Sequence, residues 1–242
     1  MAGGAEDLSA ATEFYDPAAN AFMPGPTMNA NREALTTTVI VAGPNTGKIL
    51  LAGGWGEKRG GSTVSVASTE LYDPVTNTFA SPGATPTMKT PRAYHTATVI
   101  PSGPNAGKVL IAGGQDDHDP RQSMEVCSLS STELYDPTTN QFAHGPQMHW
   151  RRTTQSAGVI STGPNAGKIL IAGGFGSQFS KATDCRTAPL ASTELYDPLT
   201  NTFAVGPSMP AAPGVVVAVE LPPAPSPRSA GSSSGRPRAL RQ

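Results

Sequence analysis

A block of twelve residues occurs three times at a spacing of 60 residues, and this repetition constrains the fold more than any other feature. It reads GPNTGKILLAGG at 43–54, GPNAGKVLIAGG at 103–114 and GPNAGKILIAGG at 163–174. A second block occurs four times, as ATEFYDPAANAF at 11–22, STELYDPVTNTF at 68–79, STELYDPTTNQF at 131–142 and STELYDPLTNTF at 192–203. Self-similarity at such a period indicates a fold built from repeated supersecondary units, each burying its apolar face against its neighbour.

Each repeat contains four short segments that are typical of β-strands. The run 109–112 (VLIA) is continuously apolar, as expected of a strand buried on both faces, and we expect it to be innermost. The segment 132–135 alternates polar and apolar residues, a third strand is expected around Phe142, and the run 96–100 gives the fourth strand of the preceding copy. Helical periodicity is absent. The sequence therefore predicts an all-β fold of four-stranded antiparallel blades, a β-propeller or a propeller fragment.

The repeats divide residues 1–220 into about four blades, and the Pro/Ser/Arg-rich tail 221–242 is predicted to be disordered because it lacks apolar residues. The expected blades are 2–41, 48–100, 108–160 and 168–220. The segment 1–4 (MAGG) aligns with the end of the apolar strand, so we expect the first blade to be cut and the ring to be incomplete. Open blade edges are then expected to permit self-association.

Composition excludes several classes of protein. The formal net charge is −1 and only 14% of residues are charged, so the basic patch of a nucleic-acid-binding protein is missing. No apolar run approaches the roughly 18 residues that a membrane span needs. The chain shows no signal peptide, whereas its surface composition slightly favours an extracellular or cell-surface setting over the cytoplasm; the location stays open.

Residues at fixed positions of the repeat resemble the Kelch family, in which a double glycine after a strand is followed by a spaced tyrosine and a second aromatic residue. The likeness covers roughly residues 2–210 and is particularly close to bacterial Kelch-like proteins. The repeats also resemble those of the central domain of galactose oxidase. Phenylalanine stands where the family usually has tryptophan. The residues that carry it are Gly53, Gly54, Tyr72 and Phe79; Gly113, Gly114, Tyr135 and Phe142; and Gly173, Gly174, Tyr196 and Phe203. The resemblance implies a Kelch-type propeller.

Two further sets of repeated residues are predicted to be structural. Glutamates and arginines recur in step and are expected to form ion pairs within or between blades; Glu194 would be the exception, because Pro213 replaces its arginine. The repeated tyrosines are expected to be core residues whose hydroxyls bond to the backbone. These residues are Glu13, Glu70, Glu133, Arg32, Arg92 and Arg152, with Tyr15, Tyr72, Tyr135 and Tyr196.

Three long, non-repetitive connections, 55–68, 115–131 and 175–192, are the candidate binding region, because loops on a rigid scaffold often carry function. Strand alternation is expected to place all three on one face. The alternative is that they are length-tolerant insertions without a ligand. The candidate binding residues are Trp55, Glu57, Arg59, Asp116, Asp117, His118, Asp119, Arg121, Phe175, Gln178 and Phe179.

The same loops contain candidate residues for a metal site and for a disulfide. Asp116, Asp117 and Asp119 are a weak calcium candidate, because calcium-loop spacing is absent and a solvated acidic loop fits better. We therefore expect no metal and no cofactor. Cys127 and Cys185 lie in equivalent loops, where a disulfide is conceivable. Two free thiols are favoured, because the cysteines sit at different offsets from the repeat.

The sequence favours a non-enzymatic Kelch-repeat interaction scaffold that binds a protein or glycan through the loop face. One alternative is the propeller portion of a secreted carbohydrate oxidase resembling galactose oxidase. For that chemistry the remaining candidates are His95 beside Tyr94, and His144 and His149 beside Trp150, but they show no copper-ligand pattern. Another alternative is an inert segment of a larger surface protein. Fold alone does not decide among them.

Overall fold

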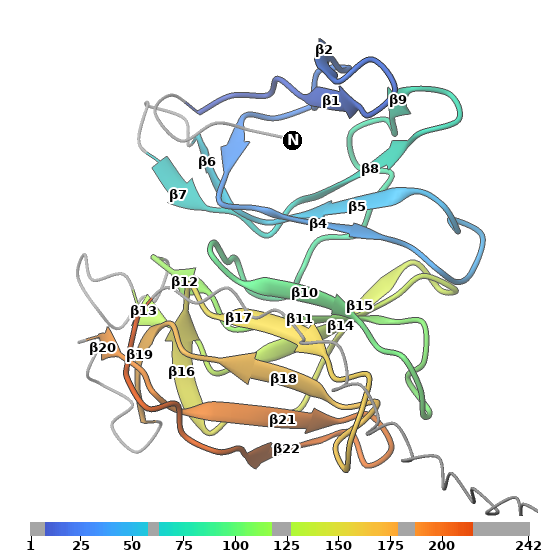
Figure 1. Cartoon of the computed structure of the whole chain (residues 1–242). Coiled ribbons are helices and arrows are strands. Elements are labelled where there is room, and N and C mark those ends of the chain that lie inside the picture. Colours follow the sequence, from blue (N-terminus) through green and yellow to red (C-terminus); the bar gives the residue numbers. More distant parts are fainter. Residues whose placement is uncertain (1–7, 58–62, 118–126, 179–186, 215–242) are drawn as a thin grey trace, which may run out of the picture.

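The computed structural model describes residues 8–57, 63–117, 127–178 and 187–214, and within these ranges the chain forms strands and turns without a helix. Three four-stranded antiparallel sheets follow one another along the chain (Figure 1). In spatial order they are β4 (Thr36–Val39), β5 (Ile49–Ala52), β8 (Thr69–Asp73) and β9 (Thr78–Phe79); β10 (Thr96–Val99), β11 (Val109–Ala112), β14 (Thr132–Asp136) and β15 (Gln141–His144); and β17 (Ser156–Val159), β18 (Ile169–Ala172), β21 (Thr193–Asp197) and β22 (Thr202–Val205). A hairpin of β1 (Glu13–Asp16) and β2 (Ala21–Pro24) precedes them. The predicted all-β fold class is confirmed.

The order of strands within a sheet differs from the prediction. The apolar strand β11 is not innermost; it lies between β10 and β14, and β10 forms the edge that contacts β4 and β17 of the neighbouring sheets. A continuously apolar run indicates that a strand is buried on both faces. A strand in the middle of a sheet is buried in this way, as is a strand near the propeller axis, so the run does not identify the innermost strand. The sequence of β10 (TATV) alternates polar and apolar residues, as expected of a strand with one less crowded face. The innermost strand of each sheet is therefore the first in sequence, which is β4, β10 or β17.

The turn 43–47 and its copies thus join the first two strands of one sheet and do not lead into the next blade. The sheets span residues 36–79, 96–144 and 156–205, whereas the blades expected at 48–100, 108–160 and 168–220 are each displaced by one strand. Residues 1–7 and the tail 221–242 lie outside the described residues.

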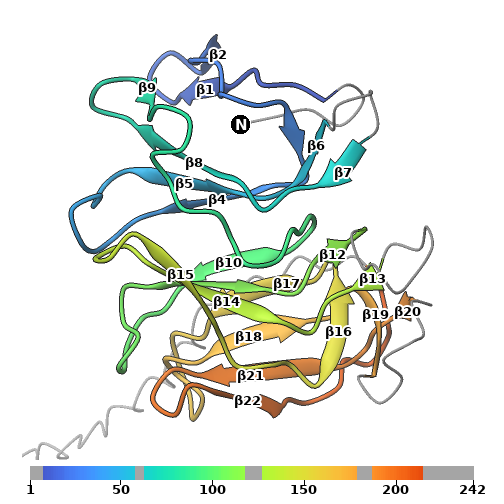
Figure 2. The ribbon, with the colours of Figure 1, turned by 180° about the vertical axis from the view of Figure 1, so that it is seen from behind.

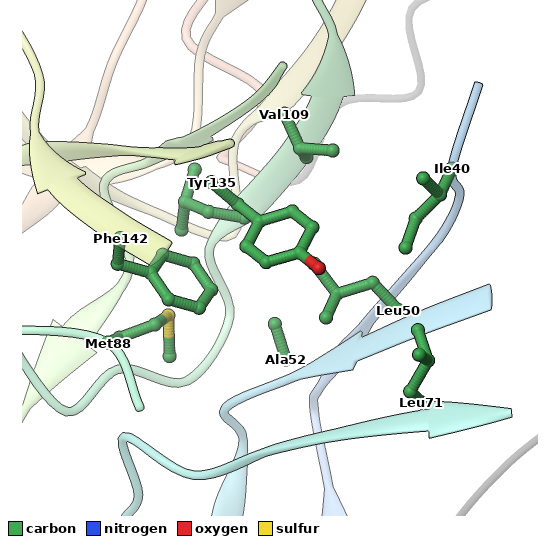
Figure 3. Close-up of a cluster of buried hydrophobic side chains, with 9 residues drawn as sticks. Ile40, Leu50, Ala52, Leu71, Met88, Val109, Tyr135 and Phe142 are labelled. Atoms are coloured by element: carbon green, nitrogen blue, oxygen red, sulfur yellow. The ribbon is translucent and has the colours of Figure 1, made fainter. Parts of the chain in front are cut away.

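Adjacent sheets stack face to face (Figure 2), and apolar side chains pack between them (Figure 3). Between the first two four-stranded sheets, Tyr135 and Phe142 lie opposite Ile40, Leu50 and Leu71, and none of these five side chains is more than 6% exposed. The two rings contact each other, with centroids 5.0 Å apart. Tyr196 and Phe203 repeat this arrangement in the next sheet, with centroids 5.3 Å apart. The repeated aromatic pair is therefore the core of each boundary between blades.

A buried arginine–glutamate pair crosses each of these two boundaries, and a third pair joins the segment after the β1–β2 hairpin to the first four-stranded sheet. The predicted pairing is confirmed, at 3.1 Å for Arg32–Glu70, 3.0 Å for Arg92–Glu133 and 3.1 Å for Arg152–Glu194. Each arginine belongs to the segment that precedes the glutamate's sheet, so Pro213 does not deprive Glu194 of its partner. The expectation that Glu194 would be the exception is wrong, because each glutamate pairs with the arginine that comes before it in the sequence and not with the one after it.

The tyrosine hydroxyls bond to side chains and not to the backbone. Each donates to the Oδ1 of an asparagine five residues on, as Tyr135 does to Asn140 at 2.9 Å. That asparagine has a positive φ of 53°, a conformation that asparagine tolerates better than most residues. Tyr135 and Tyr196 are fully buried, whereas Tyr15 is 52% exposed, so Tyr15 is not the core residue that the repeat predicted. No described sheet covers the face of the hairpin on which Tyr15 lies.

Cys127 is disulfide-bonded, which corrects the expectation of free thiols. The only other cysteine of the sequence, Cys185, lies outside the described residues. Cys127 itself is buried in the short strand β13 (Cys127–Ser128). The different offsets of the two cysteines from the repeat do not indicate whether a cysteine is disulfide-bonded, because loops of unequal length can still lie side by side.

His95 is buried where β10 meets β4, and its Nε2 lies 2.9 Å from the Thr36 hydroxyl. Burial, helped by the nearby Arg92 charge, lowers the pKa of His95 from 6.5 to about 3. The side chain is therefore neutral at physiological pH. Gln155 occupies the same position in the next repeat and is also buried.

We predict that Glu133→Gln destabilises the chain by about 3–5 kcal/mol, because it leaves the buried charge of Arg92 without its partner. Urea unfolding with the disulfide intact measures this. Lys108→Ala, which removes the partly exposed Lys108–Asp136 pair, is the control and costs at most about 1 kcal/mol. Equal losses in the two variants would contradict the prediction.

We predict that Cys127→Ser lowers the free energy of unfolding by about 2–5 kcal/mol, because a cross-link restricts the unfolded chain. The parent in reductant should unfold at the same urea concentration as the variant. Thiol counting on the denatured, unreduced parent should find no free thiol, and two free thiols would refute the bond.

We predict a loss of stability in acid that depends on His95. Because its folded pKa is depressed, its contribution is complete above pH ~6.5 and is lost as the pH falls toward 3, by about 2–3 kcal/mol at pH 4.5. His95→Gln, which copies Gln155, should remove this part of the acid sensitivity. His144→Gln at an exposed site is the control and should retain it; equal pH profiles for all three proteins would rule the prediction out.

Candidate functional site

A second layer of short strands stands at one end of the three sheets. It comprises β3 (Arg32–Glu33), β6 (Trp55–Glu57) and β7 (Thr63–Ser65); β12 (Gln115–Asp116) and β13; and β16 (Trp150–Thr153), β19 (Phe175–Gln178) and β20 (Ala188–Pro189). Both views place all of these strands at the same end of the blades (Figures 1 and 2). The predicted long connections supply most of them. We call this surface the loop face.

The double glycines direct the chain into this layer. Gly113 and Gly114 have positive φ values of 64° and 93°, which few other residues adopt without strain. The N–H of Gly114 donates to the Arg152 carbonyl at 2.9 Å, and a Cβ on Gly113 would lie 2.6 Å from the same oxygen. Only glycine fits this close approach. The residue after each pair then begins a strand of the loop face.

Two carboxylates join the first two loops. The Ser65 hydroxyl donates to Asp117 Oδ1 at 2.6 Å and lies 3.0 Å from Asp116 Oδ1, and the Ser65 N–H also donates to Asp117. Ser65 belongs to the connection 55–68, and the two aspartates belong to 115–131. These side chains therefore link loops of neighbouring blades, a role that sequence reasoning did not assign to them.

Contacts of a different kind join the second loop to β16, which pairs with β19 of the third loop. Leu129 and Arg152 form an isolated antiparallel bridge, with the Arg152 N–H donating to the Leu129 carbonyl at 3.0 Å. The Arg151 guanidinium donates to the Ser128 carbonyl, and Thr153 donates to the Gln115 side chain, each at 3.4 Å. The three loops thus form one continuous surface. No repeated motif marks these residues, so the sequence offered no signal for them.

The described candidate residues gather on the loop face. Trp55 and Phe175 hold the same position after their glycine pairs, both are half-buried, and Gln115 holds that position between them. Glu57 is exposed at the end of β6. Gln178 is the last residue of β19, whereas Arg59, His118, Asp119, Arg121 and Phe179 lie outside the described residues.

The remaining chemical groups do not converge on the loop face. Within the described ranges, no three His, Cys, Asp or Glu side chains are grouped as metal ligands. Asp119 of the calcium candidate lies outside those ranges. His149 Nδ1 lies 3.0 Å from Glu194 Oε2, beside the buried ion pair, and His144 is exposed on β15. The described residues form no helix that is long and apolar enough to span a membrane.

Two cavities lie away from the loop face. One, of about 200 Å³, separates the β1–β2 hairpin from the next sheet and is lined mainly by Phe14, Ile49, Leu51, Tyr72 and Phe79. The other, of about 160 Å³, adjoins the Arg32–Glu70 pair, whose carboxylate already accepts bonds from two backbone N–H groups. Both are gaps in the packing between repeats, and neither combines several unpaired reactive groups.

Comparison with known proteins agrees with this geometry. The Kelch motif matches residues 91–149 and 165–210. No curated protein sequence matches the chain. A solved structure titled "Structure of YjhT" is 15% identical in sequence and superposes with a TM-score of 0.57 over 79% of this chain.

That likeness shows the fold alone, and the chain spans 56% of the length of that structure. The motif matches fall on the sheets that carry the double glycines and the Tyr–Phe pairs, which are the residues that form the blade boundaries here. The chain is therefore a Kelch-repeat protein with a β-propeller-type fold.

Proposed function

We propose that this protein is a non-enzymatic interaction scaffold that binds a protein or a glycan through the loop face. The observation that carries the proposal is the joining of three loops into one surface. Ser65 and Asp117 join the first two loops, and the Leu129–Arg152 bridge joins the second loop to β16, which pairs with β19 of the third. These contacts support a built surface and not three separate insertions.

The rigidity of the underlying sheets supports this role. The loops begin directly after buried strands such as β11, whose four residues are at most 1% exposed. Loops fixed to such a scaffold present their side chains in a defined arrangement before any ligand arrives, which lowers the entropy cost of binding.

The chemistry of the face suits a polar ligand with an apolar side. Trp55 and Phe175 offer partly exposed aromatic surface, and Asp116, Gln115 and Glu57 offer carboxylate and amide groups between and beside them. Aromatic rings stack on the apolar faces of sugars and of peptide side chains, while carboxylates and amides accept their hydroxyl and N–H donors. This combination favours a glycan or a peptide segment as ligand.

We predict that ligand binding by this protein depends on the side chains of Trp55 and Glu57. The probes are a panel of immobilised oligosaccharides of defined termini and a displayed peptide library, with affinities of the selected ligands measured by calorimetry. Trp55→Ser and Glu57→Lys should each weaken binding by at least about tenfold, equivalent to 1.4 kcal/mol.

Val75→Lys is the matched control, because Val75 is 91% exposed in a turn remote from the loop face, and this variant should bind as the parent does. Ligands that bind the Trp55 and Glu57 variants as tightly as the parent would show that the loop face is not the binding surface. If the copper-loaded chain oxidised galactose and reduced dioxygen to hydrogen peroxide, that result would overturn the non-enzymatic role.

A further inference from the structure

Each boundary between four-stranded sheets is built from the same two complementary halves. The preceding sheet contributes one isoleucine and two leucines, and the following sheet contributes a tyrosine and a phenylalanine. The first boundary pairs Ile40, Leu50 and Leu71 with Tyr135 and Phe142; the second pairs Ile100, Leu110 and Leu134 with Tyr196 and Phe203.

The last sheet carries the aliphatic half of a boundary, one isoleucine and two leucines, and no other described sheet packs on it. Ile160, Leu170 and Leu195 hold the positions of the isoleucine and the two leucines, and all three are partly exposed. Their counterparts at the two internal boundaries are at most 6% exposed. We call these three residues the tail face.

The first hairpin presents the second half. Tyr15 and Phe22 hold the positions of the aromatic pair, and their ring centroids are 5.3 Å apart, as at the internal boundaries. They are 52% and 57% exposed, whereas Tyr135 and Phe142 are 0% and 4% exposed. We call these two residues the head face. The elements that carry these faces, the β1–β2 hairpin and the sheet of β17, β18, β21 and β22, lie at opposite ends of the arc of sheets (Figures 1 and 2).

Contacts between turns complete each internal boundary. The Asn45 side chain lies near the Tyr135 hydroxyl of the next sheet, and the Asn105 side chain lies near that of Tyr196. Gly43 lies so close to the Pro137 carbonyl that a Cβ would be 2.5 Å from its oxygen.

The turn beside the tail face has the same residues but a different neighbourhood. Asn165 and Gly163 are the counterparts of Asn45 and Gly43, and a Cβ on Gly163 would meet no atom of the described chain within 4 Å. Beside the head face, Tyr15 and Pro17 are the counterparts of Tyr135 and Pro137. Both sides of the turn contact are therefore present on one chain, at opposite ends.

We propose that the tail face of one copy packs on the head face of a second copy, reproducing an internal blade boundary between molecules. The occupant is a second copy because the same sequence already shows, twice, that these two surfaces fit. A head-to-tail contact of this kind is heterologous, so it leads to a closed ring or to an open string of copies. Pro213 stands at the position of the buried arginine, so the junction lacks that ion pair and its association is reversible.

Light scattering on the full chain, over a range of concentrations, tests this assembly. The parent should show masses that are multiples of 24.8 kDa and rise with concentration. The double substitution Tyr15→Glu and Phe22→Glu on the head face should give monomers, as should Ile160→Glu on the tail face. Asn165→Lys, at a surface turn, is a second tail variant that leaves the core intact, and circular dichroism checks that each variant is folded.

Mixing a head variant with a tail variant is the decisive measurement. One intact head and one intact tail remain, so the mixture should form 1:1 dimers and nothing larger. Val75→Glu, outside both faces, should assemble as the parent does. A parent that stays monomeric at every concentration, a head variant that still assembles, or folded head and tail variants that fail to form dimers on mixing would each overturn the proposal.

Discussion

The buried arginine at each blade boundary is the interaction on which the rest of the structure depends. Arg92 is fully buried and donates to the Gly113 and Ser131 carbonyls, at 2.7 and 3.1 Å, as well as to Glu133. The Glu133 carboxylate in turn accepts the N–H groups of Lys89 and Thr90. One side chain therefore ties the incoming segment to the double glycine and to the Tyr-bearing strand of the next sheet. Such a pair is costly to bury. Two backbone carbonyls accept from the Arg92 Nη1, whereas its Nε has no hydrogen-bond partner among the described residues.

The same carbonyl network links the fold to the loop face. The segment that carries Arg152 also forms β16, pairs with β19 and bridges to Leu129, so the residues that fix the blade boundary also position the loops. Ser65 and Asp117 extend this connection to the neighbouring loop. A ligand bound to one loop would therefore meet a surface whose neighbours are held in place. Function, in a fold that hosts many unrelated roles, is expected in such a grafted surface and not in the sheets.

Repetition gives this architecture an additional property. Both internal boundaries use the same two halves, and the β1–β2 hairpin and the last four-stranded sheet each present one such half that no other described sheet covers. Clustered exposed aromatic and aliphatic side chains mark contact surfaces in soluble proteins. Tyr15 and Tyr135 have similar local sequences, and the difference in their exposure follows from whether a described sheet covers the ring.

Much of the fold and part of the site followed from the sequence by itself. The repeat determined the all-β fold, the Arg–Glu pairs, the aromatic pairs and the location of the long loops, because identical residues at identical spacing must adopt one structure that buries them repeatedly. What only the tertiary structure decided was how these pieces meet. Strand β10, and not β11, is innermost; Glu194 pairs backward with Arg152; Ser65 reaches Asp117; and Cys127 is bonded. All of these depend on distances between segments far apart in the chain, and hydrophobic pattern and spacing report burial without reporting which neighbour provides it.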